Sequence, residues 1–150
     1  MRTRIVWALI ILQFLLGLGA ALGGGLLVLA PDGHFLQMPL DMLRTTPFAT
    51  FLLPGILLFT MVGLYPLAVA YSLFARPAWS WPDRINPFKT IEWAWAASLA
   101  AGVVVIVWIC VQMILLGAVA FAHVLYLGWG IAIIVLTLAP TVRQSYIRTT

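Results

Sequence analysis

Charged side chains are scarce in this chain. Only 8% of its 150 residues are Asp, Glu, Lys or Arg, while 64% are hydrophobic, against about 25% and 45–50% in a typical soluble domain. A chain of this size cannot bury so much apolar surface in one water-soluble core, so its main solvent must be lipid. The few basic residues lie at the ends of apolar runs, which is typical of membrane proteins and excludes nucleic-acid binding.

Residues that carry chemistry are also few. The single cysteine, Cys110, excludes an internal disulfide and any multi-cysteine metal site. No acidic residue lies at the centre of an apolar run, where proton and cation transporters usually keep one, and no catalytic or phosphate-binding motif is present. We therefore expect no enzyme, cofactor or metal. Joint metal or haem binding by His34 and His123, both expected on one side of the membrane, is the alternative.

Four apolar stretches are long enough to cross a bilayer as helices, which takes about 20 residues. They cover residues 5–30, 48–74, 91–118 and 120–139. The last two nearly touch, which predicts a tight turn at 117–121 between antiparallel helices. The sequence thus predicts an all-α polytopic membrane protein, a four-transmembrane-helix bundle that forms one domain over residues 1–150.

The first stretch has a second interpretation, as a cleaved signal peptide. "MRTR" resembles the basic start of such a peptide, and "GLGAALG" offers small residues for cleavage. The apolar run continues to Ala30, however, which is longer than a normal signal segment. We expect a retained helix.

The basic residues predict the orientation. In a four-helix threading only Arg44 falls on one side, and the others fall opposite: Arg2, Arg4, Arg76, Arg84, Lys89, Arg143 and Arg148. Because basic residues favour the cytoplasmic side, both termini and the 75–90 loop are expected there. The opposite loop, residues 31–47, is expected to form a short interfacial segment with helical turns after Pro39 and an Asp41–Arg44 pair. It is either a lid over a cavity or a lipid-surface element.

Four tryptophans and the acidic residue Glu92 lie in or near the 75–90 loop. Trp79, Trp81, Trp93 and Trp95 are expected to form an interfacial belt, with a binding cage as the alternative. Glu92 is expected in the first turn of the third helix, where the helix dipole favours a carboxylate, with Lys89 and Arg84 close by. A role for Glu92 as a proton carrier is the alternative.

Two glutamines lie inside apolar runs. Counting about 1.5 Å per residue, Gln112 reaches the level of Pro54, Tyr126 and Gly24, and Gln13 the level of Pro66, Tyr65 and Ser98. The two amides are therefore not expected to bond each other. A proline inside a helix leaves the carbonyl four residues earlier without a donor, and in lipid a neighbour must supply one. Each amide is expected to bond across helices at such a point.

The alternative for these amides is a ligand site. Its candidate residues are Gln112, Trp108, Tyr126, Gln13 and His123, although the simplest interpretation of His123 is an interfacial residue that caps a helix or bonds a neighbour. Small residues on the first helix (Gly17, Gly19, Ala20, Ala21, Gly23 and Gly24) and a seam on the third (Ser98, Ala101, Val105, Trp108, Gln112 and Leu115) predict close helix packing.

Two sequence segments carry a resemblance to a family. "WICVQMILLG", followed by "HVLY" and "GWG", and "TPFATFLLPGILLF" resemble a group of small bacterial four-helix integral membrane proteins. The resemblance implies a bacterial inner-membrane location and the same architecture, but no activity. We expect a protein that acts by helix packing among membrane lipids, as a homo-oligomer or an accessory subunit of a larger complex. The alternative is a carrier or binding protein for a neutral or apolar small molecule or lipid, with its site in the outer half of the bundle.

Overall fold

Four long helices dominate the structure. The computed structural model describes residues 3–148. Its long helices are α1 (Arg4–Leu29), the continuous run of α2 (Leu52–Leu57), η3 (Leu58–Leu64) and α3 (Tyr65–Ala75), α5 (Trp93–Leu116), and α6 (Phe121–Leu138). Each of the four is long and apolar enough to cross a membrane. The predicted all-helical, four-span architecture is confirmed, with bounds that differ from the expected ones by a few residues.

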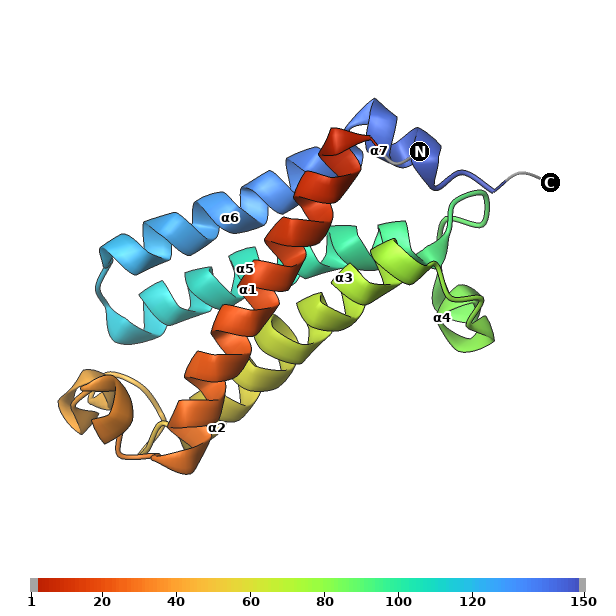
Figure 1. Ribbon diagram of the computed structural model, residues 1–150. Helices are drawn as coiled ribbons and strands as arrows, with labels where there is room; N and C mark the ends of the chain where they lie inside the picture. The colour runs from red at the N-terminus through yellow and green to blue at the C-terminus, as the bar shows by residue number, and fades with distance from the viewer. Residues whose placement is uncertain (1–2, 149–150) are drawn as a thin grey trace.

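The short elements gather at the two ends of the bundle (Figure 1). The loop end carries η1 (His34–Leu36), which was not predicted, and η2 (Leu40–Leu43), which follows Pro39 as expected. Arg44 pairs with Asp41 at 3.0 Å, also as expected. The terminal end carries the start of α1, α4 (Ser80–Ile85) and α7 (Pro140–Ser145). The predicted basic side matches the terminal end, except that Arg2 lies outside the described residues.

The prolines of the second span do not act as predicted. Pro54 lies in the first turn of α2, where a helix has no hydrogen bond to lose, so the expected interruption there is wrong. Pro66 follows the π-helical segment η3, in which the Tyr65 N–H donates to the carbonyl of Thr60, five residues back. The wider turn accommodates a residue that has no N–H of its own.

Glycines bring α1 against η3 at backbone distance. A Cβ built on Gly17 would lie 2.7 Å from the Gly63 carbonyl oxygen, and one on Gly24 would lie 2.5 Å from the Phe59 nitrogen. The predicted small-residue face of the first helix is therefore used for packing. Gly19 and Gly23, in contrast, meet little or nothing, since a Cβ on Gly19 would have no neighbour within 4 Å.

The helices α5 and α6 form the second close pair. Gly117 adopts a left-handed conformation (φ 62°) at the predicted turn between them. Along the hairpin, a Cβ on Gly102 would lie 2.6 Å from the Ile134 side chain, and one on Gly130 would lie 2.9 Å from that of Ile106. This pair is held together as closely as α1 and η3.

The two pairs meet mainly in the terminal half. Side-chain hydrogen bonds tie them together there, from Gln13 to Ser98, from the Tyr65 hydroxyl to the Ala97 carbonyl, and from the Trp129 indole to the Leu12 carbonyl. The largest buried cluster includes Leu9, Val69, Trp95, Ala101 and Ile133 in the same half, and it extends to Ala20 and Ile109 beyond it. Towards the loop end the α5–α6 hairpin diverges from α1 and α2 (Figure 1).

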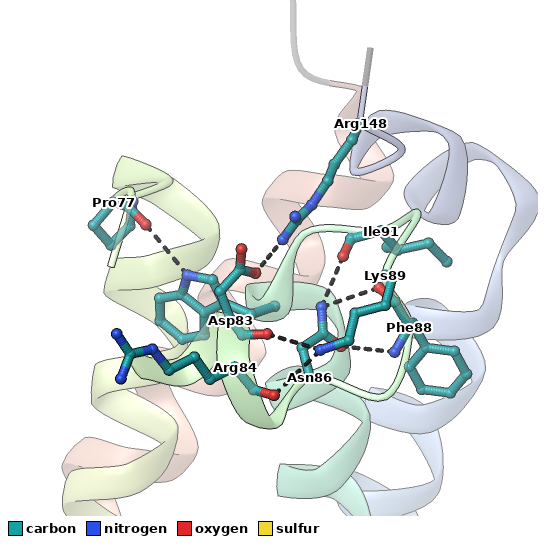
Figure 2. Close-up of polar contacts among 9 residues, drawn as sticks. Pro77, Asp83, Arg84, Asn86, Phe88, Lys89, Ile91 and Arg148 are labelled. Atoms are coloured by element: carbon teal, nitrogen blue, oxygen red, sulfur yellow. Dashed lines mark hydrogen bonds and ion pairs between the residues drawn. The ribbon is translucent and has the colours of Figure 1, made fainter. Parts of the chain in front are cut away.

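The loop before α5 is organised by Asn86 (Figure 2). Its buried side chain donates to the carbonyls of Phe88 and Ile91 and accepts from the Phe88 N–H. Arg148 forms an ion pair with Asp83, and Lys89 donates to the carbonyls of Asp83 and Arg84. The C-terminal tail is thereby attached to this loop, and the Ile91–Ile147 bridge extends the contact.

Two expectations near this loop are corrected. Trp95 is not in an interfacial belt: its side chain is buried and its indole N–H donates to the Thr137 carbonyl at 2.7 Å. Glu92 is the residue before α5 and pairs with Arg76 at 3.5 Å, whereas Lys89 and Arg84 were expected. Trp79 and Trp81 are exposed as predicted, and Trp79 stacks on Trp93.

Candidate functional site

A cavity of about 320 Å³ opens between the diverging helix pairs, toward the loop end. All four long helices contribute to its walls, together with the loop segment at residues 31–47, the outer segment. The residues are Gly19, Ala20, Gly23 and Leu27 of α1, Leu58 and Val62 of η3, Val105, Trp108, Ile109, Gln112 and Leu116 of α5, Ala122, His123 and Tyr126 of α6, the turn residue Ala120, and Leu36, Met38 and Met42 above them. Most of this wall is hydrocarbon, which suits an apolar ligand.

Small residues keep the cavity open on the α1 side. Gly19 faces it with no atom within 4 Å of the place a Cβ would occupy, and at Gly23 the nearest atom would be a Leu58 methyl at 3.9 Å. On the opposite wall, the predicted seam of α5 changes character along its length. Its first residues, Ser98, Ala101 and Val105, are buried, whereas Trp108 and Gln112 are only half-buried and line the cavity.

The outer segment covers the loop end of the cavity. Leu36, Met38 and Met42 contribute apolar side chains to its lining. The segment is attached to α5 by Thr45, whose hydroxyl donates to the Leu115 carbonyl at 2.7 Å. Next to it, the His34 ring lies 2.6 Å from Asp32, and this hydrogen bond lowers the pKa of the exposed Asp32 carboxyl. The segment thus has the position of a lid.

Four of the five predicted site residues lie around this cavity: Gln112, Trp108, Tyr126 and His123. Within residues 3–148, the Gln112 amide, the Trp108 indole N–H and the Tyr126 hydroxyl have no hydrogen-bond partner. The expected bond from Gln112 to a neighbouring helix is therefore not formed. Its amide shares a wall with Tyr126, as the residue count predicted, and it is accessible from the cavity.

His123 has a defined hydrogen-bonding state. Its Nδ1 accepts from the Ala120 N–H at 2.9 Å, which caps the start of α6 as expected. A ring nitrogen that accepts a hydrogen bond carries no proton, so the neutral ring has its proton on Nε2. His123 therefore offers an N–H donor in addition to its capping role.

A smaller space of about 70 Å³ adjoins the cavity. It lies beneath the outer segment and is bounded by Thr46, Phe48, Phe51 and Pro54. Trp108 and Gln112 belong to the walls of both spaces. Pro54 and Gln112 thus share a level, as predicted, although no hydrogen bond joins them.

Gln13, the fifth predicted site residue, lies in a separate polar cluster. It is completely buried, and its Nε2 donates to the Ser98 hydroxyl at 3.1 Å. Ser98 in turn bonds the Thr137 hydroxyl, which donates to the Ile133 carbonyl. The predicted level with Ser98 is right, but the partner is this hydroxyl and not the Val62 carbonyl. The Gln13 Oε1 atom has no partner among the described residues.

A cleft of about 440 Å³ at the terminal end is lined by Arg76, Arg148, Asp83, Glu92 and the Trp79–Trp93 pair. Its charges are matched within the chain: Arg76 pairs with Glu92, and Arg148 with Asp83. It therefore presents no unmatched charge to a ligand. Across residues 3–148, no group of three or more His, Cys, Asp or Glu side chains is placed to hold a metal ion.

Comparison with family models, with characterised proteins and with solved structures gives no match to this chain. The resemblance to small bacterial membrane proteins accordingly stays a prediction. The assignment of a function rests on the cavity.

Proposed function

We propose that this chain is an integral protein of a bacterial inner membrane that binds a neutral or apolar small molecule or lipid in the cavity between its helix pairs. The cavity itself carries this proposal: it is apolar, it lies under a covering segment, and its size is at the lower end of the roughly 300–1,000 Å³ typical of ligand sites. The excess of basic residues at the terminal end supports a cytoplasmic location for that end. In this proposed orientation the cavity belongs to the outer half of the bilayer.

The packing function, as a homo-oligomer or accessory subunit, is the competing prediction. It requires no cavity, and a filled bundle would have favoured it. The open space at Gly19 and the absence of partners for the Gln112 amide within residues 3–148 support the binding function instead. Packing among the helices of this chain, within residues 3–148, accounts for neither feature.

A cavity-filling variant tests the proposal. Gly19→Leu adds a side chain at a position that lines the cavity without meeting another atom at its Cβ. Gly128→Leu is the matched control, since Gly128 also has nothing within 4 Å of its Cβ position but lies outside the cavity wall. Both changes replace a helical glycine by a better helix former.

Wild type and both variants are purified from native membranes, and the molecules that copurify are identified by mass spectrometry after extraction. We expect one species to be enriched with wild type and Gly128→Leu and to be lost from Gly19→Leu. Gly23→Leu repeats the test if Gly19→Leu does not fold. Identical extracts from all the folded proteins would contradict the binding function and favour the packing function.

A further inference from the structure

The walls of the two adjoining spaces contain no charged side chain. Neither lining includes an Asp, Glu, Lys or Arg residue. An ionised ligand head would lose its hydration there and gain no countercharge, and burial of an unpaired charge is strongly unfavourable. The walls therefore select an uncharged head group. This step rests on the proposed binding function.

The polar groups on the walls are mainly donors. The Trp108 indole can only donate, the His123 Nε2 carries the ring proton because Nδ1 accepts from Ala120, and the Gln112 amide has two N–H groups. The Tyr126 hydroxyl can donate or accept. The Gln112 amide oxygen is an acceptor, so the four N–H groups of Trp108, His123 and Gln112 outnumber it, and within residues 3–148 Gln112, Trp108 and Tyr126 have no hydrogen-bond partner. Such a site complements a ligand oxygen that accepts hydrogen bonds.

The rest of the space fits a hydrocarbon tail. Away from the polar groups, the walls are formed by Gly19, Ala20, Val62 and Val105, none of which offers a polar side chain. The volumes of about 320 and 70 Å³ lie near the lower limit for small-molecule sites. Volumes of this size suit a single alkyl tail better than the two chains of a phospholipid.

We infer that the cavity holds an uncharged single-chain lipid with a carbonyl oxygen in its head, such as a long-chain ketone or ester. The oxygen accepts hydrogen bonds from the donor group around Gln112, and the tail lies along Gly19. Met38 and Met42 of the outer segment cover it. Methionine side chains are flexible and adapt to ligands of different shape. The ligand class is therefore defined by the donors around Gln112 and by the apolar space along Gly19, and less by the outer segment.

Four probes with the same alkyl chain test this inference: the methyl ketone, the alkane, the carboxylate and the ammonium ion. Each is added to the full-length protein in phosphatidylcholine nanodiscs, and the shift in thermal unfolding is measured against probe concentration. We expect the ketone to bind wild type roughly tenfold more tightly than the alkane, as one or two hydrogen bonds provide. The two ions should bind no better than the alkane.

Variants locate the effect. Gln112→Leu should reduce the affinity for the ketone to about that for the alkane, because leucine keeps the bulk and removes the donors. Gln144→Leu, an equivalent change on α7 outside the cavity wall, should leave the ketone preference intact. Gly19→Leu should weaken the binding of all probes, and Gly23→Leu replaces it if it does not fold.

The failures are distinguishable. Equal binding of ketone and alkane to wild type, or tightest binding of an ion, would overturn the ligand class and leave the binding function standing. If no probe stabilises wild type more than the Gly19→Leu and Gly23→Leu proteins, the proposed function itself fails. A ketone preference that survives in Gln112→Leu would overturn the placement of the head.

Discussion

Replacing Gln13 by leucine should leave the protein as stable as before or make it more stable. The side chain is completely buried and makes one good hydrogen bond, at 3.1 Å to Ser98, with a second contact of 3.5 Å to the Ser98 carbonyl. Such a bond between membrane helices contributes about 0.6 kcal/mol on average. The amide also buries Oε1 without a partner among residues 3–148, and an unsatisfied polar atom costs about 1–3 kcal/mol. Gln13→Leu therefore changes the unfolding free energy by between about zero and 2 kcal/mol, in the stabilising direction.

Ser98→Ala should have the opposite effect. It removes the acceptor of the Gln13 amide and the donor to Thr137, and it leaves the buried amide almost without partners. Two bonds of about 0.6 kcal/mol and a stranded amide at about 1–3 kcal/mol give a loss of roughly 2–4 kcal/mol. The double variant, Gln13→Leu with Ser98→Ala, loses the Ser98–Thr137 bond but has no buried amide left without a partner. It should therefore be more stable than Ser98→Ala alone.

Reversible unfolding in mixed detergent micelles measures all three variants against wild type as a double-mutant cycle. A loss in Gln13→Leu that exceeds the roughly 0.6 kcal/mol of one average bond would refute this reasoning. It would mean that Oε1 has a partner of its own, such as an internal water. A double variant that is as unstable as the sum of the single ones would refute the coupling.

Two further predictions concern packing and topology. Gly24→Ala should destabilise the protein by about 1–3 kcal/mol through overpacking, because its Cβ would lie 2.5 Å from a backbone nitrogen of η3. Gly25→Ala, whose nearest neighbours are at 3.8 Å, should stabilise the protein by up to about 1 kcal/mol. Equal effects of the two changes in a chemical unfolding assay would disprove the close approach. A cysteine at Ser80, in a Cys110→Ser background, should react with an impermeant thiol reagent only after cell lysis, and labelling in intact cells would reverse the proposed orientation.

The four spans and the levels of the buried amides could be predicted from sequence. Span length follows from bilayer thickness, and a rise of about 1.5 Å per residue places side chains in depth. This count placed Gln13 at the depth of Ser98 and Gln112 at the depth of Tyr126. It gives no direction around the helix axis, so it could not distinguish a Gln112 that bonds a neighbouring helix from one that faces an open space.

Some errors had a signal in the sequence. The seam at Ser98, Ala101 and Val105 continues three residues earlier to Trp95, so the same spacing that predicted the seam also predicts a buried tryptophan. Asn86 precedes a proline, which is a common turn signal, and its side chain organises the loop before α5. The π-helical turn lies directly before Pro66, so the proline marks its position, but a proline alone does not distinguish a π-helical turn from a kink.

The cavity follows from where the glycines allow close approach. Gly24 brings α1 onto η3, and Gly102 and Gly130 bring α5 onto α6, so each helix pair is tightly joined along its own length. Between the pairs, the hydrogen bonds of Gln13, Tyr65 and Trp129 all lie in the terminal half, and at the loop end the outer segment is attached to α5 through a threonine hydroxyl. Two rigid pairs joined at one end must separate toward the other, and the space between them can be filled only by large side chains. At Gly19 and Gly23 the chain carries no side chain, which leaves open the space in which we propose that a ligand binds.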